Sequence, residues 1–100
     1  MPFGVFEPTG EGAGALLRGE LAMVGGCLVV KPETGTTYAV WWPSTASWDK
    51  SAQALTVNGT TYRLGDKVEV GGGEIEGEPP AGGPDACKSY KVFMATSPSK

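Results

Sequence analysis

The sequence predicts a small all-β domain, and three observations lead to that fold class. Short apolar runs are separated by clusters rich in glycine and proline, and within several runs large side chains alternate with polar or small ones. Such alternation is typical of a strand that is buried on one face. Asn58-Gly59 joins two of these runs, and Asn-Gly is typical of a tight hairpin turn. No segment combines helical apolar spacing with a capping residue, so we expect no substantial helix.

We expect six or seven short strands. In chain order they cover residues 16–24, 27–31, 36–42, 54–57, 60–64, 67–70 and 87–95. Gly25-Gly26 supplies the first turn, and Asn58-Gly59 supplies the turn of the hairpin. Residues 43–52 read as a polar loop.

The chain of 100 residues is long enough for one domain with a modest core. We expect a flexible N-terminal arm over residues 1–14, a single barrel domain over 15–95 with a long Gly/Pro loop at 71–86, and a frayed tail over 96–100. A sheet this small protects its edges best by closing on itself. The predicted architecture is therefore a small closed or partly open β-barrel, OB-like, with an SH3-like barrel as the second choice.

Two adjacent tryptophans end the third expected strand, where neighbouring side chains point to opposite faces. Trp42 shares its face with Tyr38 and Val40, so we expect it in the core. Trp41 lies on the other face among small residues. Trp41 and Trp48 are our candidate ligand-binding residues, because an exposed indole stacks well on a ligand. The simpler interpretation is that the N-terminal arm or the Gly/Pro loop covers them as a mini-core, and contact with a protein partner also stays open.

The two cysteines, Cys27 and Cys87, each begin an expected strand. An even count in these positions predicts a disulfide, which would stabilise the domain by about 4 kcal/mol on the chain-entropy model. A disulfide implies an oxidising compartment. Two buried thiols in a cytosolic protein are the alternative.

Composition argues against several function classes. The net charge of −3 gives no electrostatic reason to approach phosphate backbones, so nucleic acid is not expected as a partner. The chain has no histidine, which removes the commonest general base and zinc nitrogen ligand. We expect no enzyme activity, no catalytic residue, no metal and no cofactor. Glu74, Glu76 and Glu78 could approach a calcium ion with Asp66 or Asp85, but a solvated acidic face explains them better.

Three stretches, GELAMVGGCLVV, YAVWWPSTASW and YRLGDKVEVGGG, followed by the late Cys87, resemble a known kind of domain. It is the small OB-like β-barrel found in bacterial secreted proteins and lipoproteins, a family of unknown function. The resemblance covers about residues 16–92 and rests on turn residues and short apolar runs. It implies an OB-like barrel, export from the cytoplasm and pairing of Cys27 with Cys87. It implies no activity and no site residues.

Our leading hypothesis is a non-catalytic binding or interaction module, secreted or in the cell envelope, whose partner is a protein or an envelope glycan. The start MPFGVFEPTGEGAGA has neither the basic residues nor the apolar core of a secretory signal, and no apolar run is long enough to span a membrane. A cytoplasmic location is therefore the alternative.

Two other function classes stay open: a cytosolic OB-fold that binds single-stranded nucleic acid, and a carbohydrate-binding module that uses Trp41 and Trp48. They differ in the state of the cysteines, in the exposure of Trp41 and in the placement of the basic residues. Those residues are Arg18, Lys31, Lys50, Arg63, Lys67, Lys88 and Lys91.

Overall fold

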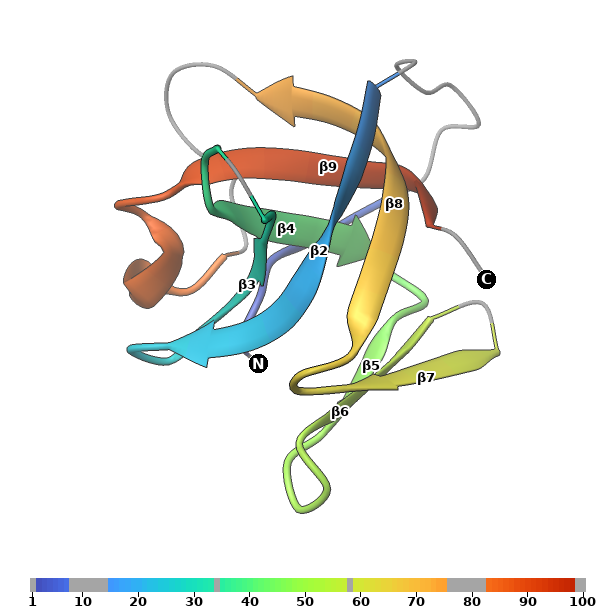
Figure 1. Ribbon diagram of the computed structural model, residues 1–100. Coiled ribbons are helices and arrows are strands. Elements are labelled where there is room, and N and C mark those ends of the chain that lie inside the picture. Colours follow the sequence, from blue (N-terminus) through green and yellow to red (C-terminus); the bar gives the residue numbers. More distant parts are fainter. Residues whose placement is uncertain (1, 8–14, 34, 58, 76–82, 99–100) are drawn as a thin grey trace.

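The computed structural model describes residues 2–7, 15–33, 35–57, 59–75 and 83–98 (Figure 1). The all-β fold class is confirmed: these residues form nine strands and one short 3₁₀ helix, η1. The strands exceed the expected six or seven because β1 lies in the expected arm and β5 in the expected polar loop. The elements are β1 (Val5–Phe6), β2 (Ala15–Val24), β3 (Cys27–Lys31), β4 (Tyr38–Pro43), β5 (Ser47–Asp49), β6 (Ala54–Val57), β7 (Thr60–Arg63), β8 (Lys67–Ile75), η1 (Asp85–Cys87) and β9 (Lys91–Pro98).

Five of the strands close into a barrel in the order β4, β3, β2, β8 and β9. Neighbours in this order pair antiparallel, and a parallel pairing of β4 with β9 closes the circle. The closing register places Tyr38 beside Lys91 and Trp41 beside Met94. In Figure 1, β2 and β8 cross the front of the barrel, and β4 and β9 cross behind them. The predicted small closed barrel is therefore present.

Three further strands, β5, β6 and β7, form a small antiparallel sheet below the barrel (Figure 1). The hairpin of β6 and β7 is the one predicted from Asn58-Gly59. Its buried side chains Leu55, Val57 and Tyr62 join the core of the barrel. The small sheet therefore closes the barrel from below rather than forming a separate unit.

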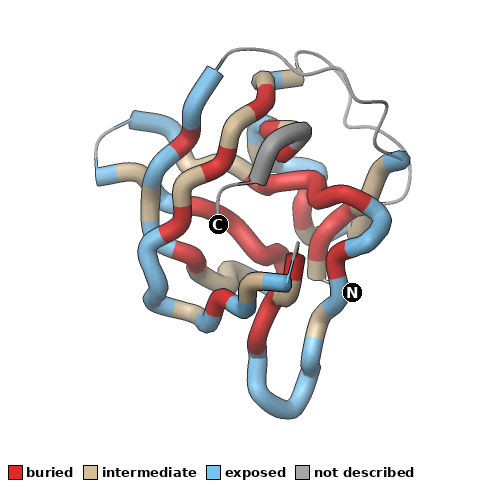
Figure 2. The backbone as a smooth tube through the Cα atoms, turned by 90° about the vertical axis from the view of Figure 1, so that its right-hand side faces the viewer, coloured by how far each residue is buried: buried red, intermediate tan, exposed pale blue. Residues whose placement is uncertain are grey.

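The inner core fills the barrel, and in Figure 2 the buried segments run mostly through the middle of the molecule. Trp42 is 0% exposed and packs there with Val40, as the alternation of large side chains along β4 predicts. Its buried members are Phe3, Leu17, Leu21, Leu28, Val30, Val40, Trp42, Ala46, Leu55, Val57, Tyr62, Val68, Val70, Phe93 and Ala95. Burial of these side chains is the main driving force for closing the barrel.

Several strand boundaries differ from those expected. The last strand, β9, begins at Lys91 and not at Cys87, because residues 85–87 form η1, whereas other strands reach beyond their expected ends. Residues 2–7 of the expected arm lie against the barrel, where β1 pairs parallel with β4, whereas residues 8–14 lie outside the described residues. β8 continues to Ile75, five residues into the expected loop, past a register shift between Gly71 and Gly73; residues 76–82 are not described. The backbone of β9 continues to Pro98, in the expected tail, because it still pairs with β8.

Candidate functional site

A second core lies on the outside of the barrel wall, on the face where the sequence places Trp41. We call it the outer core, and its buried members are Cys27, Val29, Ala39, Trp41, Cys87 and Val92. The partly buried side chains of Phe6, Tyr90 and Met94 pack against it. Strand β3 is consequently buried on both faces, since Cys27, Leu28, Val29 and Val30 are all 0% exposed.

Trp41 is only 1% exposed because two segments of backbone lie against its indole. A Cβ atom on Gly4 would come within 2.1 Å of the ring, and one on Gly83 within 2.0 Å. Only glycine lets the backbone approach an indole this closely. The indole is thus covered by the arm and by the end of the expected Gly/Pro loop, the mini-core alternative. Ligand binding by Trp41 stays a prediction, and it would require the segments around Gly4 and Gly83 to move away from the indole.

Cys27 and Cys87 form a disulfide, as predicted, and both residues are fully buried in the outer core. The bond joins the start of β3 to η1, which follows directly after Gly83 and Pro84. The disulfide therefore anchors the Gly83 segment, which covers Trp41, to the barrel wall.

Trp48, the second candidate, lies in β5 and is half-buried. It packs against the inner core, and its ring meets that of Phe3 edge-on, with centroids 6.4 Å apart. Phe3 is 1% exposed. The arm thus touches both candidate tryptophans, but Trp41 and Trp48 belong to different cores and do not form one ligand platform.

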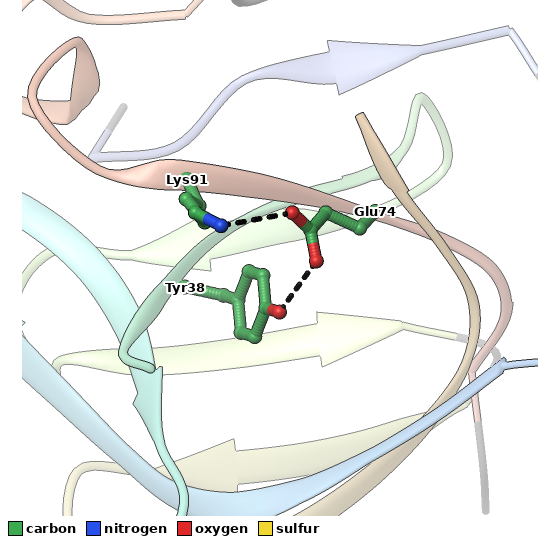
Figure 3. A network of polar contacts seen from close by, with 3 residues as sticks. All are labelled: Tyr38, Glu74 and Lys91. Atoms are coloured by element: carbon green, nitrogen blue, oxygen red, sulfur yellow. Dashed lines mark hydrogen bonds and ion pairs between the residues drawn. The ribbon is translucent and has the colours of Figure 1, made fainter. Parts of the chain in front are cut away.

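A polar network lies at one end of the barrel, which we call the barrel mouth (Figure 3). Tyr38 of β4, Glu74 of β8 and Lys91 of β9 meet there. The Tyr38 hydroxyl donates a hydrogen bond of 2.7 Å to Glu74 Oε1, and Lys91 Nζ lies 3.4 Å from Glu74 Oε2. Beneath them the Tyr38 ring makes an edge-on contact with Phe93 of the inner core, with centroids 5.8 Å apart. Three strands therefore contribute an aromatic ring, a carboxylate and an ammonium group to one place.

Contacts within the network shift the pKa values of Glu74 and Tyr38. The hydrogen bond from Tyr38, helped by Lys91, lowers the pKa of the Glu74 carboxyl despite the opposing effect of partial burial. The same hydrogen bond, followed by burial and the nearby negative charge, raises the pKa of the Tyr38 hydroxyl. Both shifts favour a neutral phenol on Tyr38 and a carboxylate on Glu74 at neutral pH, beside the amino group of Lys91. Such a set can donate and accept hydrogen bonds with a polar ligand.

The sequence does not indicate this network, because its three residues fall into different groups there. Tyr38 belongs to the face expected in the core, Glu74 to an expected acidic face and Lys91 to the basic residues whose placement the sequence leaves open. The pairings of β9 with β4 and with β8 bring them together, and no local pattern encodes these registers. Glu76 and Glu78, the other members of the expected acidic face, lie outside the described residues.

The described basic residues are spread over several strands and turns rather than forming one positive surface. Four of them are ion-paired: Arg18 with Glu69, Lys67 with Glu33, Lys88 with Asp85 and Lys91 with Glu74. On the outside of β2, Glu20 lies between Lys31 of β3 and Lys67 of β8. This surface therefore mixes both signs of charge.

Comparison with known protein families, curated proteins and solved structures finds no match to this chain. In the described part of the chain, no helix has the length and apolar character to cross a membrane. Nor do the described residues include a group of three or more His, Cys, Asp or Glu side chains that could hold a metal ion. Function is therefore inferred from the chemistry of the barrel surfaces.

Proposed function

We propose that this protein is a non-catalytic, extracytoplasmic binding module whose partner is a protein or a cell-envelope component. The observation that carries the proposal is the barrel mouth, where Tyr38, Glu74 and Lys91 converge over the inner core. Barrel mouths are common places for ligands, and a few convergent polar groups above an apolar floor give orientation and specificity. An aromatic ring beside a carboxylate and an ammonium suits a polar envelope component, glycans included.

The disulfide supports the compartment in this proposal. Disulfides persist in secreted, periplasmic and surface proteins and are rare in the cytosol. Cys27–Cys87 joins two parts of the chain that are 60 residues apart and lies fully buried. A bond that closes so long a loop belongs to the folded framework, which favours a protein that works where thiols are oxidised.

We further infer that the barrel is of the OB type, with β2, β3, β4, β8 and β9 as its five strands and the β5–β7 sheet inserted between the third and the fourth. OB barrels bind oligonucleotides mainly on the face of their second and third strands. Here those strands are β3 and β4, whose outer face holds Val29, Ala39 and Trp41 under the arm and η1. The mixed charges of the barrel surface also argue against the cytosolic nucleic-acid alternative.

The proposal is tested by sedimenting the oxidised protein with purified bacterial cell-envelope material and, separately, with single-stranded DNA on beads. The variant Glu74→Gln with Lys91→Met removes the charges of the barrel mouth. The matched control, Glu20→Gln with Lys31→Met, removes one charge of each sign from the outer surface, where these residues pair across β2 and β3.

We expect wild type and control to bind the envelope material, and the barrel-mouth variant to bind at least roughly tenfold more weakly, which corresponds to the loss of one charge-assisted contact. Equal loss in both variants would reject the barrel mouth as the binding surface. Binding to DNA but not to envelope material would reject the proposed partner class.

A further inference from the structure

We propose that the edge of β4 that holds the N-terminal arm is a strand-acceptor site, and that it takes the same segment from a second copy of this chain. The arm is residues 2–7, and the acceptor edge is Trp42, Pro43 and Ser44, at the end of β4. β9 pairs with β4 only as far as Trp41. The arm begins where that pairing stops, since Val5 lies beside Trp42 and Phe6 beside Pro43. The acceptor edge is thus the part of β4 that barrel closure leaves without a partner strand.

The arm is held through its backbone. Its alternate carbonyl groups accept hydrogen bonds from the barrel: Leu28 N–H donates to Pro2 O at 2.8 Å, Trp42 N–H to Gly4 O at 3.0 Å and Ser44 N–H to Phe6 O at 2.8 Å. This is the pattern by which an extended peptide adds a strand to an exposed sheet edge. An empty edge would leave the N–H groups of Trp42 and Ser44 without these acceptors, which favours its occupation by some extended segment.

Side chains on the arm make the acceptor edge selective. Phe3 is buried in the inner core and Val5 packs against it, whereas Phe6 packs against the outer core. Gly4 lies so close to the Trp41 indole that any Cβ would collide with it. The acceptor edge therefore fits an extended segment with an aromatic residue, then glycine, then an apolar residue, then a second aromatic residue. Residues 3–6 of this chain, Phe-Gly-Val-Phe, supply that pattern.

The disulfide does not fix the arm to the barrel, because it joins β3 to η1. Seven residues, 8–14, connect the arm to β2, and seven extended residues reach at most about 25 Å. The molecule measures 31 × 28 × 27 Å along its principal axes, so the arm can reach a second copy whose acceptor edge lies near the contact between the two molecules. Exchange of arms would preserve every contact that the arm makes, which is why swapping is a low-cost route to a dimer.

The first test uses the full-length Gly4→Val variant, in which the arm collides with Trp41 and the acceptor edge is left open. A synthetic peptide of residues 1–7, MPFGVFE, is added, and binding is followed through the indole NMR signal of Trp41. We expect saturable binding of this peptide and none of the same peptide carrying Gly4→Val. Wild-type protein should bind the peptide at least roughly tenfold more weakly, because its own arm is present at a millimolar effective concentration. Equal binding of both peptides, or no binding by a folded variant, would overturn the acceptor site.

The second test uses only wild-type protein, so it does not depend on whether a variant folds. Wild-type protein labelled with nitrogen-15 is mixed with unlabelled protein, unfolded with its disulfide intact, refolded at roughly millimolar concentration and analysed by native mass spectrometry. We expect mixed dimers of intermediate mass, with their fraction rising with concentration. A purely monomeric sample would reject the second copy as the occupant, even where the peptide binds.

Discussion

The two cores of this protein lie on opposite sides of one barrel wall and are closed in different ways. The inner core is enclosed by the five barrel strands and the small β5–β7 sheet, with Phe3 of the arm packed into it. The outer core is closed by the arm from one end of the chain and by Gly83 and η1 from near the other, with a disulfide between η1 and β3. Val29 and Val30 are neighbours on β3 and equally buried, yet they point into different cores.

The two cores have different consequences for the molecule. The inner core follows from alternating strands and determines that the chain forms a barrel. The outer core determines which surface remains available, because it covers Trp41 and the outer face of β3 and β4. The exposed surfaces of the described residues include the barrel mouth and a surface of mixed charge. We therefore expect the two cores to respond to substitutions as distinct units.

The largest expected effect comes from the adjacent tryptophans. Trp42→Ala should lower the free energy of unfolding by about 5 kcal/mol and Trp41→Ala by about 3 kcal/mol, the two ends of the usual range for a buried tryptophan. The inner cavity is enclosed by the barrel, whereas the arm and the Gly83 segment can settle into the outer one. Denaturant titration of both oxidised variants measures the difference. Equal losses would mean that the outer cover is as rigid as the barrel.

Removal of the disulfide should act mainly on the outer core. The double variant Cys27→Ala with Cys87→Ala should lose about 4 kcal/mol, because the unfolded chain regains the freedom of a 60-residue loop. Amide hydrogen exchange should become fast first in η1, where Cys87 N–H donates to Pro84 O, while the β2–β8 ladder stays protected. Uniform loss of protection along the whole barrel would contradict two distinct cores.

The neighbouring valines on β3 give a matched comparison. Val29→Ala and Val30→Ala should each cost roughly 1.5–3 kcal/mol, since both side chains are 0% exposed. In the background without the disulfide, the cost of Val29→Ala should fall by half or more, and the cost of Val30→Ala should stay the same. A double-mutant cycle measures this coupling. Equal coupling of both valines to the disulfide would mean that the two cores behave as a single unit.

The smallest effect concerns the barrel mouth and lies outside both cores. The pKa of Glu74 is below its ordinary value of 4.5, so its contribution to stability is present above that value. The contribution is lost as the pH falls through the lowered pKa of the folded state. Glu74→Gln should therefore destabilise the protein slightly at pH 7 and not at all once the wild-type carboxyl is protonated. Denaturant midpoints along a pH series measure this, and Tyr38→Phe should weaken the same dependence. A pH-independent difference would contradict the network.

Much of the fold could be predicted because its signals are local. The alternation of Tyr38, Val40 and Trp42 indicates the inner face, and Asn58-Gly59 indicates the hairpin. The disulfide is predicted from the even number of cysteines, although only Cys27 begins a strand, as expected, whereas Cys87 lies in η1. Each of these features depends on a few neighbouring residues, which a single sequence displays directly.

The outer core and the barrel mouth could not be predicted in the same way. Cover over Trp41 was one of three alternatives, but Gly4 and Gly83 reach the indole from distant parts of the chain. β1 is only two residues long, too short to show alternation. At the barrel mouth, Tyr38 meets Lys91 through the closing register of β4 and β9, which many distant contacts decide together. Candidate sites were therefore harder to find than the strands that carry them.

Hydrogen exchange of the three indole N–H groups, followed by NMR on the oxidised wild-type protein, tests the outer core most directly. Trp41 and Trp42 are buried and Trp48 is half-buried. The indole signals of Trp41 and Trp42 should persist in heavy water long after that of Trp48 has disappeared. A Trp41 signal that is lost as fast as that of Trp48 would show that the outer face is open, and would contradict a core closed by the arm and the disulfide.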